Sequence, residues 1–149
     1  MRFIGFYLFC LLSFAAFTSE AAEFVTTQST HSVSDTMSRL VKAIEAKGLK
    51  VFSRIDHAKG AKSIGESLKP AQVVLFGHPK LGTILMKAEP KIGLDLPLKV
   101  LIYEDQAGKT WLVHASADTL KARYGVKGAD KPFKNMAAAL AGLVKQAVQ

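Results

Sequence analysis

Apolar and polar positions recur along this chain with two different periods, and each period predicts one kind of element. Between residues 34 and 48 apolar side chains return every three or four positions, which predicts a helix that Ser34 caps and Gly48 ends. From residue 49 to residue 57 the period is two, which predicts a strand whose inward row ends at His57.

The middle of the chain predicts a buried strand followed by a short helix. Residues 73–76 form an unbroken apolar run, which is typical of a central strand covered on both faces. Glycine and proline interrupt the run at residues 77–82. We expect Thr83 to cap a helix that finishes near Pro90.

Two further apolar runs, residues 98–104 and 110–114, predict a β-hairpin. The register that closes its turn places Tyr103 opposite Trp111, and an aromatic pair at facing positions supports that register. The hairpin therefore belongs to an antiparallel sheet.

The two ends of the chain complete the pattern. Residues 24–30 are rich in β-branched side chains and predict a first strand, while residues 117–124 and 131–148 predict helices. The resulting order, β-α-β-α-β-α-β-β-α-α, indicates a single α+β domain over residues 23–149, in which helices cover a mostly antiparallel sheet.

Residues 1–22 carry the features of a signal peptide that is removed. A positive start precedes fifteen residues without charge, and small residues follow at the expected cleavage site. That run is shorter than the roughly 20 residues that span a bilayer, so we expect a periplasmic or secreted protein with no stable membrane span after cleavage. Cleavage also removes Cys10, the single cysteine, and with it any thiolate chemistry.

The net charge of +8 restricts the class of partner. The lysines are dispersed, without an arginine cluster or interleaved aromatic residues, so we expect no nucleic-acid partner. An anionic small molecule fits this charge better. No cofactor is indicated by any motif.

Three spaced motifs resemble a bacterial family called domain of unknown function 302. They are Phe52-x-x-Ile55-Asp56-His57, then Leu75-Phe76-Gly77-x-Pro79-Lys80-x-Gly82-Thr83, then Gly93-Leu94-Asp95-Leu96-Pro97-Leu98 with Tyr103-Glu104-Asp105. The resemblance implies a β-α-β(4)-α arrangement similar to the TATA-binding-protein-like fold, and a homodimer. It implies no activity, and the position of His78 usually holds asparagine in this family.

The loop 77–83 is the first candidate binding site. A helix that starts beside a buried strand presents free backbone N–H groups, and Lys80 adds a positive charge, so Gly82 and Thr83 would help to hold an anion. The alternative is that the glycines only make the turn and Thr83 only caps the helix.

Histidines supply the second candidate site. His57 and His78 are residue types that bind zinc, copper or nickel without thiolates, provided that their strands are neighbours. The hairpin register places His114 opposite Val100, roughly 13 Å from Glu104, so His114 and Glu104 cannot share a site. The alternative is that these histidines are structural.

Glu104 ends an apolar row and is the third candidate. If it were buried, it or His57 would serve as the general base of a hydrolase or isomerase. The alternative for Glu104 is a salt bridge beside the turn. No serine lies in a nucleophile motif, so we favour a non-catalytic, exported module for a small molecule or anion. Its candidate ligand-binding residues are His57, His78, Lys80, Gly82, Thr83 and Glu104.

Overall fold

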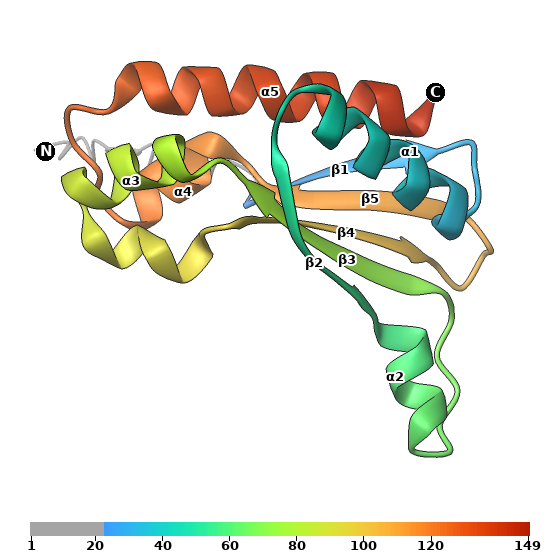
Figure 1. Ribbon diagram of the computed structural model, residues 1–149. Helices are drawn as coiled ribbons and strands as arrows, with labels where there is room; N and C mark the ends of the chain where they lie inside the picture. Colours follow the sequence, from blue (N-terminus) through green and yellow to red (C-terminus); the bar gives the residue numbers. More distant parts are fainter. Residues whose placement is uncertain (1–22) are drawn as a thin grey trace, which may run out of the picture.

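The computed structural model describes residues 23–149, and the predicted signal peptide therefore lies outside the described residues. The described part alternates strands and helices in the predicted order (Figure 1). The elements are β1 Phe24–Ser29, α1 Val33–Ala46, β2 Lys50–Asp56, α2 His57–Ser63, β3 Ala71–Gly77, α3 Pro79–Ala88, the 3₁₀ helix η1 Pro90–Asp95, β4 Leu98–Glu104, β5 Thr110–Ala115, α4 Ala117–Arg123 and α5 Asp130–Val148.

The five strands form one antiparallel sheet in the order β1-β5-β4-β3-β2. The two long helices, α1 and α5, pack against each other on the same face of this sheet (Figure 1). The five strands and these two helices follow one another in the β-α-β(4)-α order. The short helices α2, α3, η1 and α4 are additions to that order. The predicted α+β class is confirmed.

The core lies between that face and the two long helices. Alternate residues of the inner strands point into it, among them Phe76 of β3 and Ile102 of β4, and Leu40 and Leu140 meet them from the helices. Such alternation follows from the pleat of a strand, which turns successive side chains to opposite faces. The same pleat turns the neighbouring residues to the other face.

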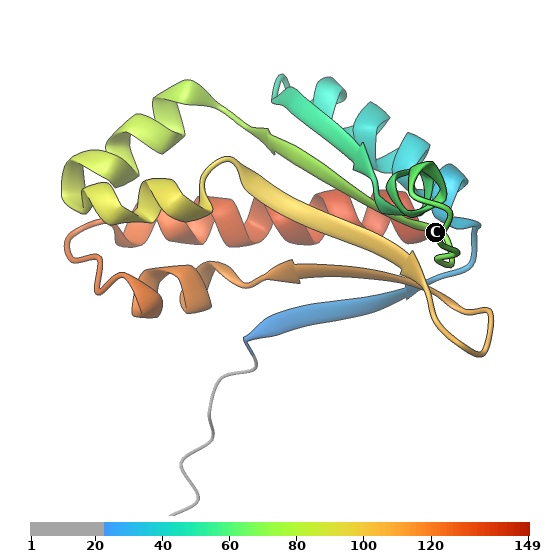
Figure 2. The same ribbon diagram turned by 90° about the horizontal axis from the view of Figure 1, so that it is seen from below.

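That other face is not covered by helices, as Figure 2 shows. Val73 and Leu75 lie on it half-buried, so the prediction of a strand covered on both faces is wrong for β3. β3 nevertheless lies inside the sheet, between β4 and β2, as predicted. A half-open apolar face is a surface on which a second copy would pack, but the expected homodimer stays a prediction, which light scattering on the purified protein checks.

The predicted inward row of β2 is wrong beyond its first residues. β2 is an edge strand with a bulge between Val51 and Ser53, and only Val51 is half-buried. Ile55 is 45% exposed, and His57 is exposed at the start of α2. The physical reason is that α2 leaves the sheet and buries none of its own side chains, so nothing covers this end of β2 (Figure 1).

Two predicted caps are displaced towards the N-terminus. Ser32, not Ser34, caps α1, because its Oγ accepts the backbone N–H of Asp35 at 3.1 Å. Helix α3 begins at Pro79 rather than after Thr83, and His78 caps it. Proline at the first helical position has no N–H to satisfy, which makes this the favourable start.

The hairpin of β4 and β5 has the predicted register, with Tyr103 opposite Trp111. Pairing ends at Leu101 and Val113, so the predicted pairing of His114 with Val100 is wrong. Beyond this point the two strands diverge, each remaining paired only to its outer neighbour (Figure 2). Within residues 23–149, no helix combines the length and apolar character needed to cross a membrane.

Candidate functional site

The two candidate histidines lie at opposite ends of the β2 and β3 pair. Gly77 faces Lys50 and Gln72 faces Asp56, so the strands are antiparallel over their whole paired length. His78 follows one end and His57 the other, which separates them by roughly 20 Å at about 3.3 Å per residue. The hypothesis of a metal site shared by His57 and His78 is therefore wrong. The described residues also contain no group of three or more His, Cys, Asp or Glu side chains placed to hold a metal ion.

The start of α3 does not present free N–H groups. The Nδ1 atom of His78 accepts the backbone N–H of Lys80 at 3.2 Å, and its carbonyl oxygen accepts the N–H groups of Leu81 and Gly82 at 3.0 and 3.1 Å. Pro79 has no N–H. The anion cradle predicted for this loop is thus wrong, because the donors that would form it are already used by His78.

An apolar hollow nevertheless opens beside the same helix, and we call it the α3 pocket. Its cavity volume is about 360 Å³. Five parts of the chain line it, namely β2, the end of β3, α3 with its cap, the segment 96–98 and α5. The lining residues are Phe52, Gly77, His78, Pro79, Leu81, Gly82, Thr83, Met86, Leu96, Pro97, Leu98 and Met136.

Three of the six predicted site residues line the α3 pocket, and Lys80, His57 and Glu104 do not. His78, Gly82 and Thr83 line it, whereas Lys80 is exposed and lies outside the lining. A Cβ atom on Gly82 would stand 3.9 Å from the side chains of Leu96 and Met86, at ordinary contact distance. The missing side chain at Gly82 therefore leaves room that a larger residue would fill.

The polar chemistry of this pocket comes from His78 and Thr83. Since Nδ1 of His78 accepts a hydrogen bond, the uncharged ring carries its proton on Nε2 and can donate it. The hydroxyl of Thr83 can donate or accept. The arrangement suits a molecule with an apolar body and one hydrogen-bond acceptor, which is the usual chemistry of a small-molecule pocket.

Glu104 lies near the other end of β3, away from the α3 pocket. Its carboxylate forms a salt bridge with Lys69 at 3.0 Å, and its side chain is 31% exposed. Glu104 therefore matches the alternative of a salt bridge beside the turn, and it is not a buried general base. A wide surface hollow of about 690 Å³ includes Glu104 and Asp56 in its lining, but His57 is not part of that lining.

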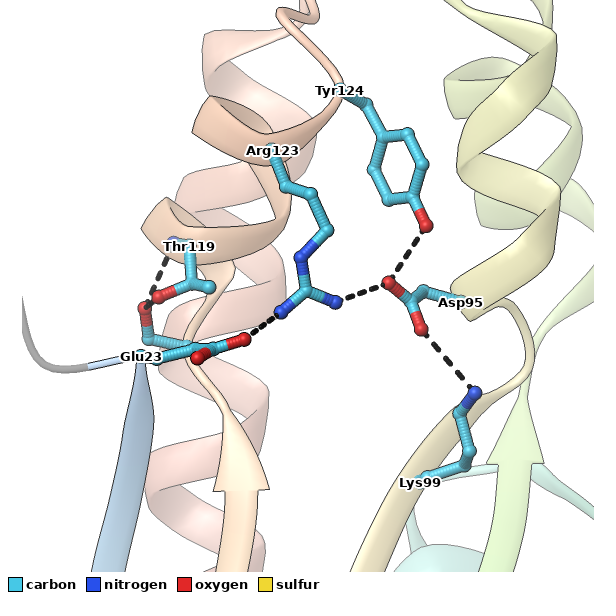
Figure 3. A network of polar contacts seen from close by, with 7 residues as sticks. Glu23, Asp95, Lys99, Thr119, Arg123 and Tyr124 are labelled. Carbon is cyan, nitrogen blue, oxygen red and sulfur yellow. Dashed lines mark hydrogen bonds and ion pairs between the residues drawn. The ribbon is translucent and has the colours of Figure 1, made fainter.

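A polar network that sequence reasoning missed connects η1 to α4 (Figure 3). Oδ2 of Asp95 accepts hydrogen bonds from Arg123 at 2.7 Å and from the hydroxyl of Tyr124 at 2.8 Å. Its Oδ1 accepts from Lys99 at 3.3 Å, and Arg123 also pairs with Glu23. Burial raises the pKa of Asp95, but the hydrogen bonds outweigh it and hold that pKa below its usual value. The sequence signal for this network was an acidic residue, Asp95, between glycine and proline. Its partner Arg123 lies 28 positions later, and no local pattern shows a contact at that separation.

Taken together, these features define an α+β domain with a five-stranded antiparallel sheet, a helix-covered core and an apolar pocket at one end of the sheet. A family model described as domain of unknown function DUF302 matches residues 25–143. The chain belongs to the DUF302 family.

A solved structure has the same fold. It is the crystal structure of an uncharacterized conserved DUF302 protein from Bacillus stearothermophilus, with a TM-score of 0.76. The likeness covers 85% of this chain and 99% of that one at 16% sequence identity. At this identity it establishes the arrangement of strands and helices alone.

Curated relatives carry the name of a channel. A fluoride-specific ion channel FluC 1 of Brucella suis biovar 1 (strain 1330) is 46% identical over 88 residues, which are 59% of this chain and 35% of that protein. A protein of the same name from Brucella abortus biovar 1 (strain 9-941) is also 46% identical over 88 residues, which are 33% of its length. The matched part thus makes up about a third of each channel protein.

Proposed function

We propose that this chain is an exported, non-catalytic module that binds a small molecule in the α3 pocket. The observation that carries the proposal is a hollow of about 360 Å³ whose lining combines apolar side chains of β2, α3 and α5 with two exposed polar residues, His78 and Thr83. Apolar walls with a few convergent polar groups are the usual composition of a ligand site. Export is supported by the sequence of residues 1–22.

The ligand that fits is largely apolar and carries a hydrogen-bond acceptor. The backbone N–H groups at the start of α3 are used by His78, so a bare anion gains little there. Nε2 of His78 remains the donor beside the pocket. This narrows the sequence-based hypothesis from a small molecule or anion to an apolar molecule with one acceptor group.

Filling the pocket is the sharpest test. We expect Gly82→Leu to abolish most of the fluorescence gain of 1-anilinonaphthalene-8-sulfonate, a dye with an aromatic body and a sulfonate acceptor group, because the new side chain occupies the hollow. Leucine is favoured over glycine in a helix by roughly 1 kcal/mol, and circular dichroism checks that the variant is folded when dye binding is lost. The matched control is Gly60→Leu in α2, where a Cβ meets no atom within 4 Å.

The contribution of His78 to dye binding is tested with a second variant in the same titration. His78→Asn keeps a side chain that caps helices well but removes the imidazole donor. We expect α3 to remain folded by circular dichroism and dye affinity to fall about three- to tenfold, the worth of one hydrogen bond. Undiminished dye binding in both Gly82→Leu and His78→Asn would refute the α3 pocket as the site.

A second candidate function follows from the channel relatives. Because a region 46% identical to this chain makes up about a third of proteins named fluoride-specific ion channels, the domain would act beside such a channel, outside the membrane. The charge of +8 would raise the local fluoride concentration. The measurement is the ¹⁹F line width of fluoride with and without the protein, at low and high salt. Unbroadened lines at low salt would remove this candidate.

A further inference from the structure

The divergence of β4 and β5 leaves a second cavity, which we call the strand-gap cavity. The two strands pair only from Leu101 and Val113 to the turn, although each continues beyond that point. A cavity of about 610 Å³ fills the wedge between them. Its walls are apolar and include Leu101, Val113, Leu120 and Leu140. Antiparallel neighbours normally stay paired, so this gap is a specific feature of the sheet.

A buried histidine lines this cavity and also a smaller hollow of about 290 Å³ that Val25 and Thr27 of β1 help to line. His114 points to the covered face of β5 and is 7% exposed. Its Nδ1 atom lies 2.8 Å from the carbonyl oxygen of Ala115. A carbonyl oxygen only accepts, so Nδ1 must donate, and in the uncharged ring Nε2 is left as an acceptor. Within residues 23–149, the hydrogen bonds of His114 involve Nδ1 alone.

The mouth of the cavity carries charges that neutralise one another. Asp95 and Arg123 reach towards each other from η1 and α4, and Lys99 and Glu23 complete the group (Figure 3). Two acidic and two basic side chains, paired together, leave no net charge at the rim. A charged ligand would lose its hydration in the apolar interior without finding a free counter-ion.

The geometry points to the strand-gap cavity as a binding site for a small uncharged molecule with an apolar body and one hydroxyl or N–H donor, which donates to Nε2 of His114. Phenols and simple indoles have this chemistry. This site shares only Leu98 with the lining of the α3 pocket. Its polar group is the opposite one, since His78 offers a donor there, whereas His114 offers an acceptor here. Neither proposal depends on the other.

The experiment compares p-cresol with toluene, which has the same body without the hydroxyl. Binding is followed by the ¹⁵N and ¹H shifts of the backbone amides in the intact protein, a readout that every variant keeps, and the histidine side-chain shifts are recorded beside them. We expect p-cresol to bind about three- to tenfold more tightly than toluene and to shift the Nε2 resonance of His114. His114→Phe should remove this preference while leaving toluene binding in place.

Two further variants separate a lost contact from a damaged fold. His114→Gln keeps an acceptor on a side chain of similar reach, and we expect it to restore part of the preference for p-cresol. His57→Phe makes the same substitution at an exposed imidazole outside the cavity, and it should change nothing. A p-cresol preference that survives in His114→Phe, or no saturable p-cresol shift at millimolar concentration in the wild-type protein, would overturn the assignment.

Discussion

Replacing Phe76 with alanine is expected to lower the free energy of unfolding by about 3–5 kcal/mol. The ring is 1% exposed and lies in the core between β3 and the helices that cover the sheet. Its removal loses the transfer free energy of the aromatic side chain and leaves a cavity that the surrounding helices close only in part. Since domains of this size are stable by only about 5–15 kcal/mol, the loss would be a large share of the total.

Urea unfolding measures this effect directly. Trp111 is the single tryptophan of the chain, so its fluorescence reports on the β4 and β5 hairpin without interference from other indoles. The matched control is Phe52→Ala, which removes the same ring at a position 46% exposed and should cost less than about 1 kcal/mol. If Phe76→Ala does not fold, Phe76→Leu, with an expected cost below about 1.5 kcal/mol, keeps the comparison possible. Equal losses for Phe76→Ala and Phe52→Ala would contradict the placement of the core.

Asp95→Asn is expected to have the second largest effect, a loss of about 1–3 kcal/mol at pH 7. The carboxylate is 19% exposed and accepts hydrogen bonds from Arg123, Tyr124 and Lys99. Asparagine keeps the shape but removes the negative charge, so two cations lose their shared partner. Because this carboxylate ties η1 to α4, its loss should also loosen the rim of the strand-gap cavity.

The effect of Asp95→Asn should depend on pH in a defined direction. The pKa of Asp95 is lowered in the folded protein, so its stabilising contribution is fully present above the unfolded value of about 3.9. It is lost as the pH falls below that value through the folded pKa. The difference between wild type and Asp95→Asn should therefore be constant near neutral pH and shrink below about pH 4.

A second variant separates the charge of Asp95 from a single hydrogen bond. Tyr124→Phe removes one donor to Asp95 and should cost about 0.5–1.5 kcal/mol at pH 7, less than Asp95→Asn. The measurement is urea unfolding of the three proteins across the acid range. An Asp95→Asn protein as stable as wild type at pH 7, or a difference that grows as the pH falls, would be incompatible with this network.

At the candidate site, local sequence patterns predicted which residues line a pocket better than they predicted which residues lie close together. His78, Gly82 and Thr83 were chosen because they follow a strand and open a helix, and they do line one pocket. His57 and Glu104 were grouped with them because their residue types suit binding. The antiparallel pairing of β2 and β3 sends His57 to the far end of the sheet. Period and composition carry no information on which strand ends meet.

The prediction that the 77–83 loop holds an anion was wrong for a related reason. Glycine, proline and threonine at a strand-to-helix turn are compatible with several starting points for the helix. A start at Pro79 with His78 as the cap uses the N–H groups that a later start would leave free. Leu85 of this helix is fully buried in the core, a tertiary contact that the local pattern does not show.

By itself the sequence determined the α+β class, the order of the elements and the register of the β4 and β5 hairpin, because period, turn residues and facing aromatic residues act over short distances. Tertiary structure alone decided which face of the sheet is covered, which ends of the strands meet and where β4 and β5 separate. These features involve elements far apart in the sequence, as do the packing of α1 against α5 and the hydrogen bond between Asp95 and Arg123, 28 residues later. Contacts at that separation are set by the packing of the whole chain, so both proposed sites became visible only in three dimensions.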